Sequence, residues 1–254
     1  GGGSGEKAKQ VFLCSPLAFH YLCHVPPGVS ARHASLNFLT MKHFAWTLCL
    51  VLGSWAGGQA AAQDVVSLPQ PDMARPVTLM QALAQRQSTR AYAATELSRA
   101  ELGDLLWAAV GVNRPADGKR TAPSALNKQD VDVYVLTARG AYRYDAAGHS
   151  LVGVTTQDLR PAAAAGQDFA ATAPVVLVLV SDLDKLGGKD NANALRMGAL
   201  DAGIVSQNVS LFCAAAGLAT VPRASMDAEQ LRTGLKLTEA QTPLLNHPVG
   251  HFQR

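Results

Sequence analysis

Five consecutive residues, Arg86-Gln87-Ser88-Thr89-Arg90, bring two guanidinium groups and a hydroxyl to alternate positions of the chain. Successive side chains of an extended segment point to opposite faces, so Arg86, Ser88 and Arg90 would share one face. Guanidinium groups pair bidentately with phosphate, and two of them beside a hydroxyl would form a strong anion site. A short charged segment is also typical of a solvated edge, and the spacing alone leaves both interpretations open.

Other patterns with a known chemistry are missing from the sequence. It contains no G-x-G-x-x-G loop, no Walker loop and no G-x-S-x-G nucleophile motif. The three histidines after residue 62, His149, His247 and His251, lack the spacing of metal ligands. We therefore expect no metal site and interpret these histidines as solvated or structural. Cys213 lies in an apolar helical stretch, where a small buried side chain is expected rather than a nucleophile.

The first part of the chain has the composition of a targeting segment. Residues 1–40 show no sustained apolar period, and we interpret them as a leader or an upstream extension that does not fold. Residues 41–62 have the pattern of a secretory signal peptide: a positive Lys42-His43, the apolar run AWTLCLV, and Ala60-Ala61-Ala62 as the cleavage site. The apolar run is much shorter than the roughly 20 residues that a membrane span needs. We expect cleavage near Ala62, export to the periplasm and no stable membrane anchor.

Residues 63–254 are expected to form a single domain, since their length suits one compact core. Of the 22 basic and 19 acidic residues in the chain, four and one respectively precede residue 63, which leaves 18 of each. This balance gives no indication of a nucleic-acid partner. Cys213 is the one cysteine beyond residue 62, so no intrachain disulfide is expected in this part.

Residues 193–218 are free of proline and rich in alanine and leucine, which predicts a long helix. Apolar residues occupy nearly all of its sides, so most of its circumference must be covered. Small residues on several faces, such as Ala202, Gly203 and Ser206, would let other backbones approach closely. We expect either a helix between its own sheet and a second subunit, or a buried core helix of a monomer. Gly217 is expected to end the helix in a left-handed conformation.

The other expected elements interleave helices and strands, which indicates an α+β or α/β arrangement. Thr78 and a capping box of Ser98 with Glu101 are expected to start two helices. The β-branched run at 175–181 is expected to be a central strand that is covered on both faces. The further elements are a helix at 79–86 with an apolar face of Leu79, Met80 and Leu83, a helix at 99–110 stopped by Gly111, a loop at 112–128, a hairpin of strands 131–137 and 141–145, a helix around 159–169, and a short helix at 231–237.

Several sequence blocks in the same order resemble one family. RQSTRAY at 86–92 resembles the first flavin motif of the nitroreductase family, whose members bind FMN at a homodimer interface. LLWAAVGVNR, RTAPSALN, VYVL and AYRYD are similar to the branch that includes azoline-oxidising dehydrogenases, and GQDFAATAPVVLVLVSD, GLATVP and HPVGH match later blocks. The resemblance implies a sandwich of α+β class, with a mixed, mostly antiparallel sheet flanked by helices and the long helix at the twofold interface.

The resemblance also implies which residues bind the cofactor. Arg86 and Ser88 match the pair that holds the FMN phosphate, and Arg90 matches a basic residue near the pyrimidine edge of the ring. A cation there would stabilise the negative charge that reduction produces. Segment 123–127 matches a loop that reaches the flavin from the other subunit. The full set of implied cofactor-binding residues is Arg86, Gln87, Ser88, Arg90, Pro123, Ser124, Ala125, Asn127, Gln167, Pro222, Arg223, Ala224, Ser225 and Arg254.

The activity implied by the resemblance is FMN-dependent, ping-pong hydride transfer from NAD(P)H or another donor to a small acceptor such as a nitroaromatic compound or a quinone. No side chain is assigned as a general acid or base. Some members of the family have a glutamate where this chain has Arg223-Ala224-Ser225, and Arg223 would favour an anionic substrate. Nicotinamide donors are not expected outside the cytoplasm, so an exported enzyme would need a different donor or would act as a dehydrogenase or oxidase on a small molecule or modified peptide.

Two interpretations from other classes of protein stay open. One is an exported flavin-binding protein of the same fold with little turnover. The other is a cofactor-free interaction domain, in which Arg86 and Arg90 pair with carboxylates.

Overall fold

Two apolar strands lie at the centre of the sheet, where both of their faces are covered. The computed structural model describes residues 64–253, and in it β4 (Val131–Thr137) pairs with β7 (Val175–Asp182). Side chains of β7 alternate between two apolar clusters: the odd-numbered residues from 175 to 179 belong to one, and the even-numbered residues from 176 to 180 to the other. All six are at most 5 % exposed, so the prediction of a central, doubly covered strand is confirmed.

The main sheet has seven strands in the order β1-β6-β5-β4-β7-β9-β8, and each neighbouring pair is antiparallel. β4 and β5 form the hairpin that the sequence predicts, and β6 continues it as a meander. β2 and β3 form a separate hairpin. The bounds of these strands are Val65–Ser67 for β1, Val112–Arg114 for β2, Lys119–Arg120 for β3, Gly140–Asp145 for β5, Ser150–Thr155 for β6, Leu218–Thr220 for β8 and Gln241–His251 for β9.

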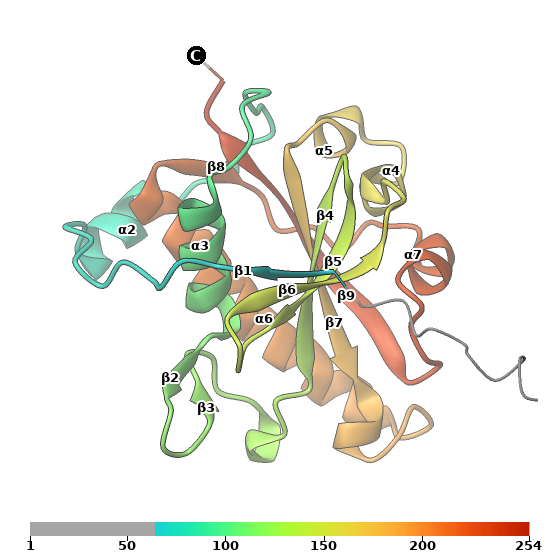
Figure 1. Cartoon of the computed structure of the whole chain (residues 1–254). Helices are drawn as coiled ribbons and strands as arrows, with labels where there is room; N and C mark the ends of the chain where they lie inside the picture. The colour runs from blue at the N-terminus through green and yellow to red at the C-terminus, as the bar shows by residue number, and fades with distance from the viewer. Residues whose placement is uncertain (1–63, 254) are drawn as a thin grey trace, which may run out of the picture. The chain divides into compact units, whose positions relative to one another are not determined.

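Helices cover both faces of this sheet (Figure 1). On one face α2, α3 and α6 lie together, and α3 and α6 pack on the odd-numbered side of β7. On the other face, α4 and α7 contribute apolar residues to the second cluster, and α5 follows α4. This confirms the expected α+β sandwich with a mostly antiparallel sheet. The helices comprise Leu79–Gln85 (α2), Arg99–Val110 (α3), Arg160–Ala164 (α4), Asp168–Ala171 (α5), Ala192–Ala216 (α6) and Ala228–Gly234 (α7).

α6 is the long helix that the sequence predicts, and one side of it is buried. Its buried stripe holds small or branched side chains that are at most 2 % exposed: Ala202, Val205, Val209 and Cys213. On the opposite stripe Leu200 is 58 % exposed and Ile204 is 39 % exposed. Gly217 ends the helix with a φ of 68°, the left-handed conformation predicted for it. By length and composition α6 could also cross a membrane, but its packing on the sheet is that of a core helix in a globular protein.

The starts of α2 and α3 follow the predicted capping chemistry. Both Thr78 and Ser98 form complete capping boxes, in which each side chain accepts a backbone N–H of the first turn and the third helical residue reaches back to the cap. Gly111 ends α3 as predicted. The apolar face expected on α2 is present, yet within the described chain it is uncovered: Leu79 and Met80 are 64 % and 72 % exposed.

Three local predictions are wrong. The single helix expected around 159–169 is divided into α4 and α5, because Ala165 and Gly166 between them have positive φ angles of 49° and 77°. The segment 112–128, expected as a loop, contains the β2–β3 hairpin and a 3-10 turn at Ala125–Asn127. α7 begins at Ala228 rather than at 231, because the Asp227 side chain caps it.

Candidate functional site

The segment from Arg86 to Arg90 leaves α2 and runs beside β8. Arg86 N donates to Ala82 O in α2 (2.9 Å), and Thr89 N donates to Thr220 O in β8 (2.9 Å). Arg86, Ser88 and Arg90 are exposed. Neither arginine forms an ion pair with any residue in the described part of the chain. Their guanidinium groups are therefore available to an anion, which favours the anion site over the carboxylate pairing of a cofactor-free domain.

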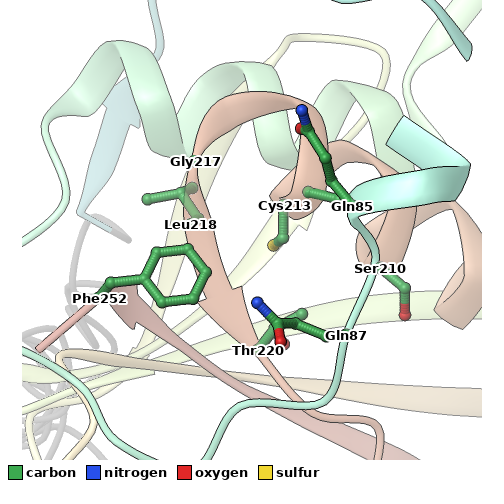
Figure 2. A pocket seen from close by; sticks show the side chains of 9 residues that line it. Gln85, Gln87, Ser210, Cys213, Gly217, Leu218, Thr220 and Phe252 are labelled. Carbon is green, nitrogen blue, oxygen red and sulfur yellow. The ribbon is translucent and has the colours of Figure 1, made fainter. Parts of the chain in front are cut away.

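Gln87 points into a pocket of about 230 Å³ between this segment, α6 and the end of β9 (Figure 2). Gln85 and Cys213 also line this pocket, and burial raises the pKa of the Cys213 thiol. The position of Gln87 between Arg86 and Ser88 is consistent with alternating directions in an extended segment. The pocket lining consists of Gln85, Gln87, Ser210, Cys213, Ala214, Gly217, Leu218, Thr220 and Phe252.

His247 is buried close to this pocket in a closed hydrogen-bond network. Thr220 Oγ1 donates to Pro248 O (2.9 Å), so it accepts from His247 Nδ1 (3.2 Å). His247 Nε2 is then unprotonated and accepts from Ser206 Oγ (2.8 Å). Burial lowers the pKa of His247 to about 3, which keeps the ring neutral. Each polar atom of the ring has a partner, so His247 is structural, as the sequence predicts.

The loop at 123–129 has a strained backbone that α6 holds in place. Three residues between 126 and 129 have φ angles from 48° to 54°, a region that residues other than glycine rarely adopt. Ala125 N donates to Asp201 Oδ2 on α6 (2.7 Å), and Gln129 N donates to Ser124 Oγ (2.8 Å). Of the candidates here, Pro123 and Asn127 are exposed, and Ser124 and Ala125 are half-buried.

Asp201, which anchors this loop, belongs to a buried acidic pair. Burial raises the pKa of Asp201 to about 6, the hydrogen bond from Ala125 opposes that shift, and the neighbouring Asp130 carboxyl adds to it. Asp130 is fully buried and accepts from Ser181 Oγ (2.6 Å). This role of Asp201 is not predicted from the sequence. The sequence feature that could have indicated this role is that Asp201 is a single acidic residue in the middle of an otherwise apolar helix.

Arg223 lies in the loop between β8 and α7, and it is not available to a substrate. Its side chain is buried and donates hydrogen bonds to Ala163 O, Ala164 O and Asn246 Oδ1. The interpretation of Arg223 as a residue that favours an anionic substrate is therefore wrong, because its donors are turned into the protein. Pro222, Ala224 and Ser225 on either side of it are exposed. Asn246, which sequence reasoning missed, is the side chain that holds this loop to β9.

Gln167 and Arg254 complete the set of candidates. Gln167 is exposed in the turn between α4 and α5, two residues before Phe169, whose ring lies 5.5 Å from the Arg223 guanidinium. Arg254 lies outside the described residues. The described residues contain no group of three His, Cys, Asp or Glu side chains that could hold a metal ion.

Two of the candidate segments lie far apart in the described chain. Gln87 lines a pocket at the C-terminal end of α6 with Cys213, whereas Ala125 is bound to Asp201 in the N-terminal half of that helix. At 1.5 Å per residue, Cys213 and Asp201 are about 18 Å apart along the helix axis. The 123–127 loop and the Arg86–Arg90 segment therefore do not meet within one subunit.

Comparisons with known proteins identify the class to which this fold and site belong. The profile described as "Nitroreductase family" matches residues 83–251. A protein of Methanocaldococcus jannaschii, provisionally named a nitroreductase, is 31 % identical over 196 residues, covering 74 % of this chain and 97 % of its own length. A crystal structure from Ralstonia eutropha JMP134, also provisionally named a nitroreductase, is 37 % identical with a TM-score of 0.70, over 75 % of this chain and 90 % of that one.

A more distant structure shares the fold. The NADPH:FMN oxidoreductase of Vibrio harveyi, in complex with NAD+, is 20 % identical with a TM-score of 0.54, over 69 % of each chain. The chain belongs to the nitroreductase family. Members of this family typically bind flavin, and membership makes the chain an oxidoreductase of the flavin-dependent type.

Proposed function

We propose that this protein is an FMN-dependent oxidoreductase that transfers a hydride by a ping-pong scheme between a donor and a small organic acceptor. The observation that supports the cofactor most strongly is the pair of exposed guanidinium groups at Arg86 and Arg90, which have no acidic partner among residues 64–253. A phosphate would supply the missing negative charge. When bound, FMN would supply the hydride chemistry at its N5 atom, and the protein would contribute position and electrostatics.

Each group of candidates then has a distinct task. Arg86 and Ser88 would bind the phosphate, and Arg90 would stabilise negative charge on the pyrimidine edge of the ring. Gln167 and the exposed residues of Pro222–Ser225 would border the ring. Gln87 would contribute through its backbone, because its side chain faces the pocket beside Cys213. Arg254 would add a further cation for the phosphate.

We further propose that the working form is a homodimer with two cofactor sites. The uncovered apolar stripe of α6, with Leu200 58 % and Ile204 39 % exposed, would pack against a second copy together with the exposed face of α2. A twofold interface would place the 123–127 loop of one subunit beside the Arg86–Arg90 segment of its partner. The separation of these two segments within one chain supports this arrangement.

The dimer is tested by light scattering on Leu200→Arg, which places a charge in the centre of the stripe. We expect a monomer that has lost FMN, because each site would need both subunits. Val65→Arg is the matched control, since Val65 is 57 % exposed on the edge strand β1 and outside the stripe. A Leu200→Arg protein that remains dimeric would refute this interface.

The cofactor is tested by an absorbance spectrum of the purified chain before and after incubation with FMN and desalting. Retention of about one flavin per subunit is expected. Anaerobic addition of NADH, NADPH and non-nicotinamide donors would then identify the compound that bleaches the bound flavin. A protein that retains no flavin would refute the proposed function. A flavin that is retained but that no donor bleaches would favour the flavin-binding protein with little turnover.

Export bears on the choice of donor. We propose that residues 41–62 direct the protein to the periplasm, where a nicotinamide donor is not expected, so the reductant there would differ from NAD(P)H. Fractionation of cells that produce the full chain, with amino-terminal sequencing of the product, tests this. An uncleaved cytoplasmic product would refute export and would restore NAD(P)H as the expected donor.

A further inference from the structure

Arg223 is a buried cation without an anionic partner among the described residues. It is 8 % exposed, and no carboxylate of residues 64–253 lies within ion-pair distance of it. Buried charges in proteins are normally paired, because transfer of an ion from water to the interior costs several kcal/mol. Its Nε atom is buried and has no hydrogen-bond partner in this part of the chain. The guanidinium therefore leaves an uncompensated positive charge inside the protein.

The acceptors that hold Arg223 are all neutral. Nη1 donates to Ala163 O (3.0 Å) and to Asn246 Oδ1 (2.8 Å), and Nη2 donates to Ala164 O (2.8 Å). The two carbonyls belong to the last turn of α4, where helical C=O groups lack partners within the helix. The Phe169 ring adds a cation–π contact at 5.5 Å. These groups solvate the charge and fix its place, but they do not cancel it.

Arg223 also connects the segments that border the proposed flavin site. Its backbone forms an antiparallel bridge with Asn246 in β9, through Arg223 N to Asn246 O (2.9 Å) and Asn246 N to Arg223 O (2.7 Å). Asn246 Nδ2 donates to Ser225 O (3.0 Å), which fixes the loop beyond Arg223. The guanidinium reaches across to the last turn of α4, just before the turn that contains Gln167. One side chain thus braces two candidate segments against each other.

The electrostatic effect of Arg223 extends to the exposed arginine segment. Burial is the main cause of the raised pKa of Tyr92, and both Arg223 and Arg90 oppose that rise. Burial also lowers the pKa of Arg223, and Arg90 lowers it further by repulsion. Arg90 and Arg223 therefore act on one another and on the same phenol. Two cations that repel one another without an intervening carboxylate form a region of positive potential.

We propose that Arg223 is a positioning residue of the flavin site that fixes the Pro222–Ser225 loop and supplies a buried positive charge favouring reduced over oxidised FMN. The inference rests on the proposed function and extends it. Uptake of a hydride adds one negative charge to the flavin ring, and a fixed cation in a site of low dielectric constant stabilises that charge more than it stabilises the oxidised ring. Arg223 would thus raise the midpoint potential without touching the substrate.

Two variants separate the positive charge of Arg223 from the hydrogen bonds by which its side chain holds the loop, which we call the Arg223 brace. Arg223→Gln removes the cation and part of the hydrogen bonding. Asn246→Asp keeps the acceptor beside Nη1 but places a carboxylate there, which would neutralise the guanidinium where it stands. Arg160→Gln is the control, because Arg160 also donates to a backbone carbonyl, that of Ala173, but is already neutralised by Asp158.

The measurement is the ratio of the dissociation constants for oxidised and reduced FMN, obtained by anaerobic titration, together with the melting temperature of the chain without FMN. We expect Arg223→Gln and Asn246→Asp to weaken binding of reduced FMN about tenfold relative to oxidised FMN, equal to about 30 mV for a two-electron couple. Arg160→Gln should keep the wild-type ratio. Arg223→Gln should also lower the melting temperature, whereas Asn246→Asp should lower it less, because Arg223 keeps its acceptors and only the Asn246 Nδ2 donor to Ser225 O is lost.

The outcomes distinguish this inference from the proposed function. A wild-type chain that does not bind FMN refutes both. A wild-type chain that binds FMN, with an unchanged ratio in Arg223→Gln and Asn246→Asp, refutes the role of Arg223 alone. If Arg223→Gln does not fold, Asn246→Asp decides the question, since a wild-type ratio in that variant would overturn the inference.

Discussion

Arg90 and Arg223 act on the same tyrosine hydroxyl, yet one guanidinium is exposed without an acidic partner and the other is buried with three hydrogen-bond acceptors. Arg90 belongs to an extended segment that is attached to β8 through the backbone of Thr89. Arg223 belongs to a loop that is attached through a backbone bridge to Asn246 and also through the Arg223 side chain. The first arrangement leaves a cation for a ligand, and the second uses a cation to hold the fold together.

This difference predicts which property each residue controls. An exposed charge is solvated in the free protein, so its loss changes ligand binding and leaves the stability of the fold nearly unchanged. A buried charge has lost its water, so disturbing its acceptors changes the stability of the fold directly. Variants at the two places should therefore separate affinity for FMN from the free energy of unfolding.

The largest expected effect belongs to the buried region. Asn246→Leu removes an acceptor from Arg223 and the donor to Ser225 O, and it leaves a buried charge less well solvated. We expect a loss of about 3 kcal/mol in the free energy of unfolding without FMN, measured by urea denaturation. Asn193→Leu is the control, since Asn193 is exposed in the first turn of α6 and should change the stability by about 0.5 kcal/mol or less. Equal losses in the two variants would contradict the importance of the Arg223 brace.

Arg90→Ala is expected to have the second largest effect, and on the opposite property. FMN affinity should fall about 30-fold, corresponding to the loss of a hydrogen bond to a charged group of about 2 kcal/mol. Reduction of the bound flavin should become harder, while the oligomeric state and the stability of the free protein should remain those of the wild type. Fluorescence titration with FMN and urea denaturation measure the two quantities. Unchanged FMN affinity together with an unchanged reduction potential would remove the role assigned to Arg90.

Local signals in the sequence were sufficient to predict many of the elements. The Thr78 cap of α2, the capping box of α3, the glycine after α6 and the β-branched run of β7 each depend on neighbouring residues, and all were predicted from them. The break between α4 and α5 was not predicted, because the run of alanines favours a continuous helix and the local stop signal at Gly166, which has a φ of 77°, was not used. Contacts distant in sequence accompany that break: Arg223 and Asp227 both donate hydrogen bonds to carbonyls of α4.

In the candidate site, too, features that depend on neighbouring residues were predicted and features that depend on distant contacts were not. The R-x-S-x-R spacing predicted exposed cations, and the structure has them exposed. The burial of Arg223 depends on Ala163, Ala164 and Asn246, which are at least 23 positions away, so no pattern around Arg223 could reveal it. The anchoring of Ala125 by Asp201 spans 76 positions. Charges whose partners come from other elements can be placed only when the fold is known.

A third prediction extends the comparison to a buried acid. The pKa of Asp201 is raised from the model-peptide value of 3.8 to about 6. A raised pKa in the folded state means that the native protein binds more protons than the unfolded chain between these values, so stability falls as pH rises through that window. The Asn side chain of Asp201→Asn cannot titrate. Between pH 4 and pH 6.5, the free energy of unfolding of this variant should therefore fall by about 1–2 kcal/mol less than that of the wild type. Melting curves across this range measure the difference.

Asp117→Asn is the matched control for this titration, because the Asp117 side chain is 57 % exposed. It should follow the wild-type pH dependence. A parallel loss of stability in Asp201→Asn and the wild type would show that the carboxyl anchoring the 123–129 loop does not titrate in this range.

The smallest expected effect tests the directions of adjacent side chains within the exposed segment. Ser88→Ala removes one hydroxyl from the proposed phosphate site and should weaken FMN binding about fivefold, since a single hydrogen bond contributes about 1 kcal/mol. Gln87→Ala should weaken it about twofold or less, because the Gln87 amide faces the pocket beside Cys213 rather than the side proposed for Arg86 and Ser88. Equal losses in the two variants would mean that both faces of the segment contact the cofactor. The pocket at the end of α6 would then belong to the flavin site, and the distinction between free cations on one face and pocket-lining amides on the other would no longer hold.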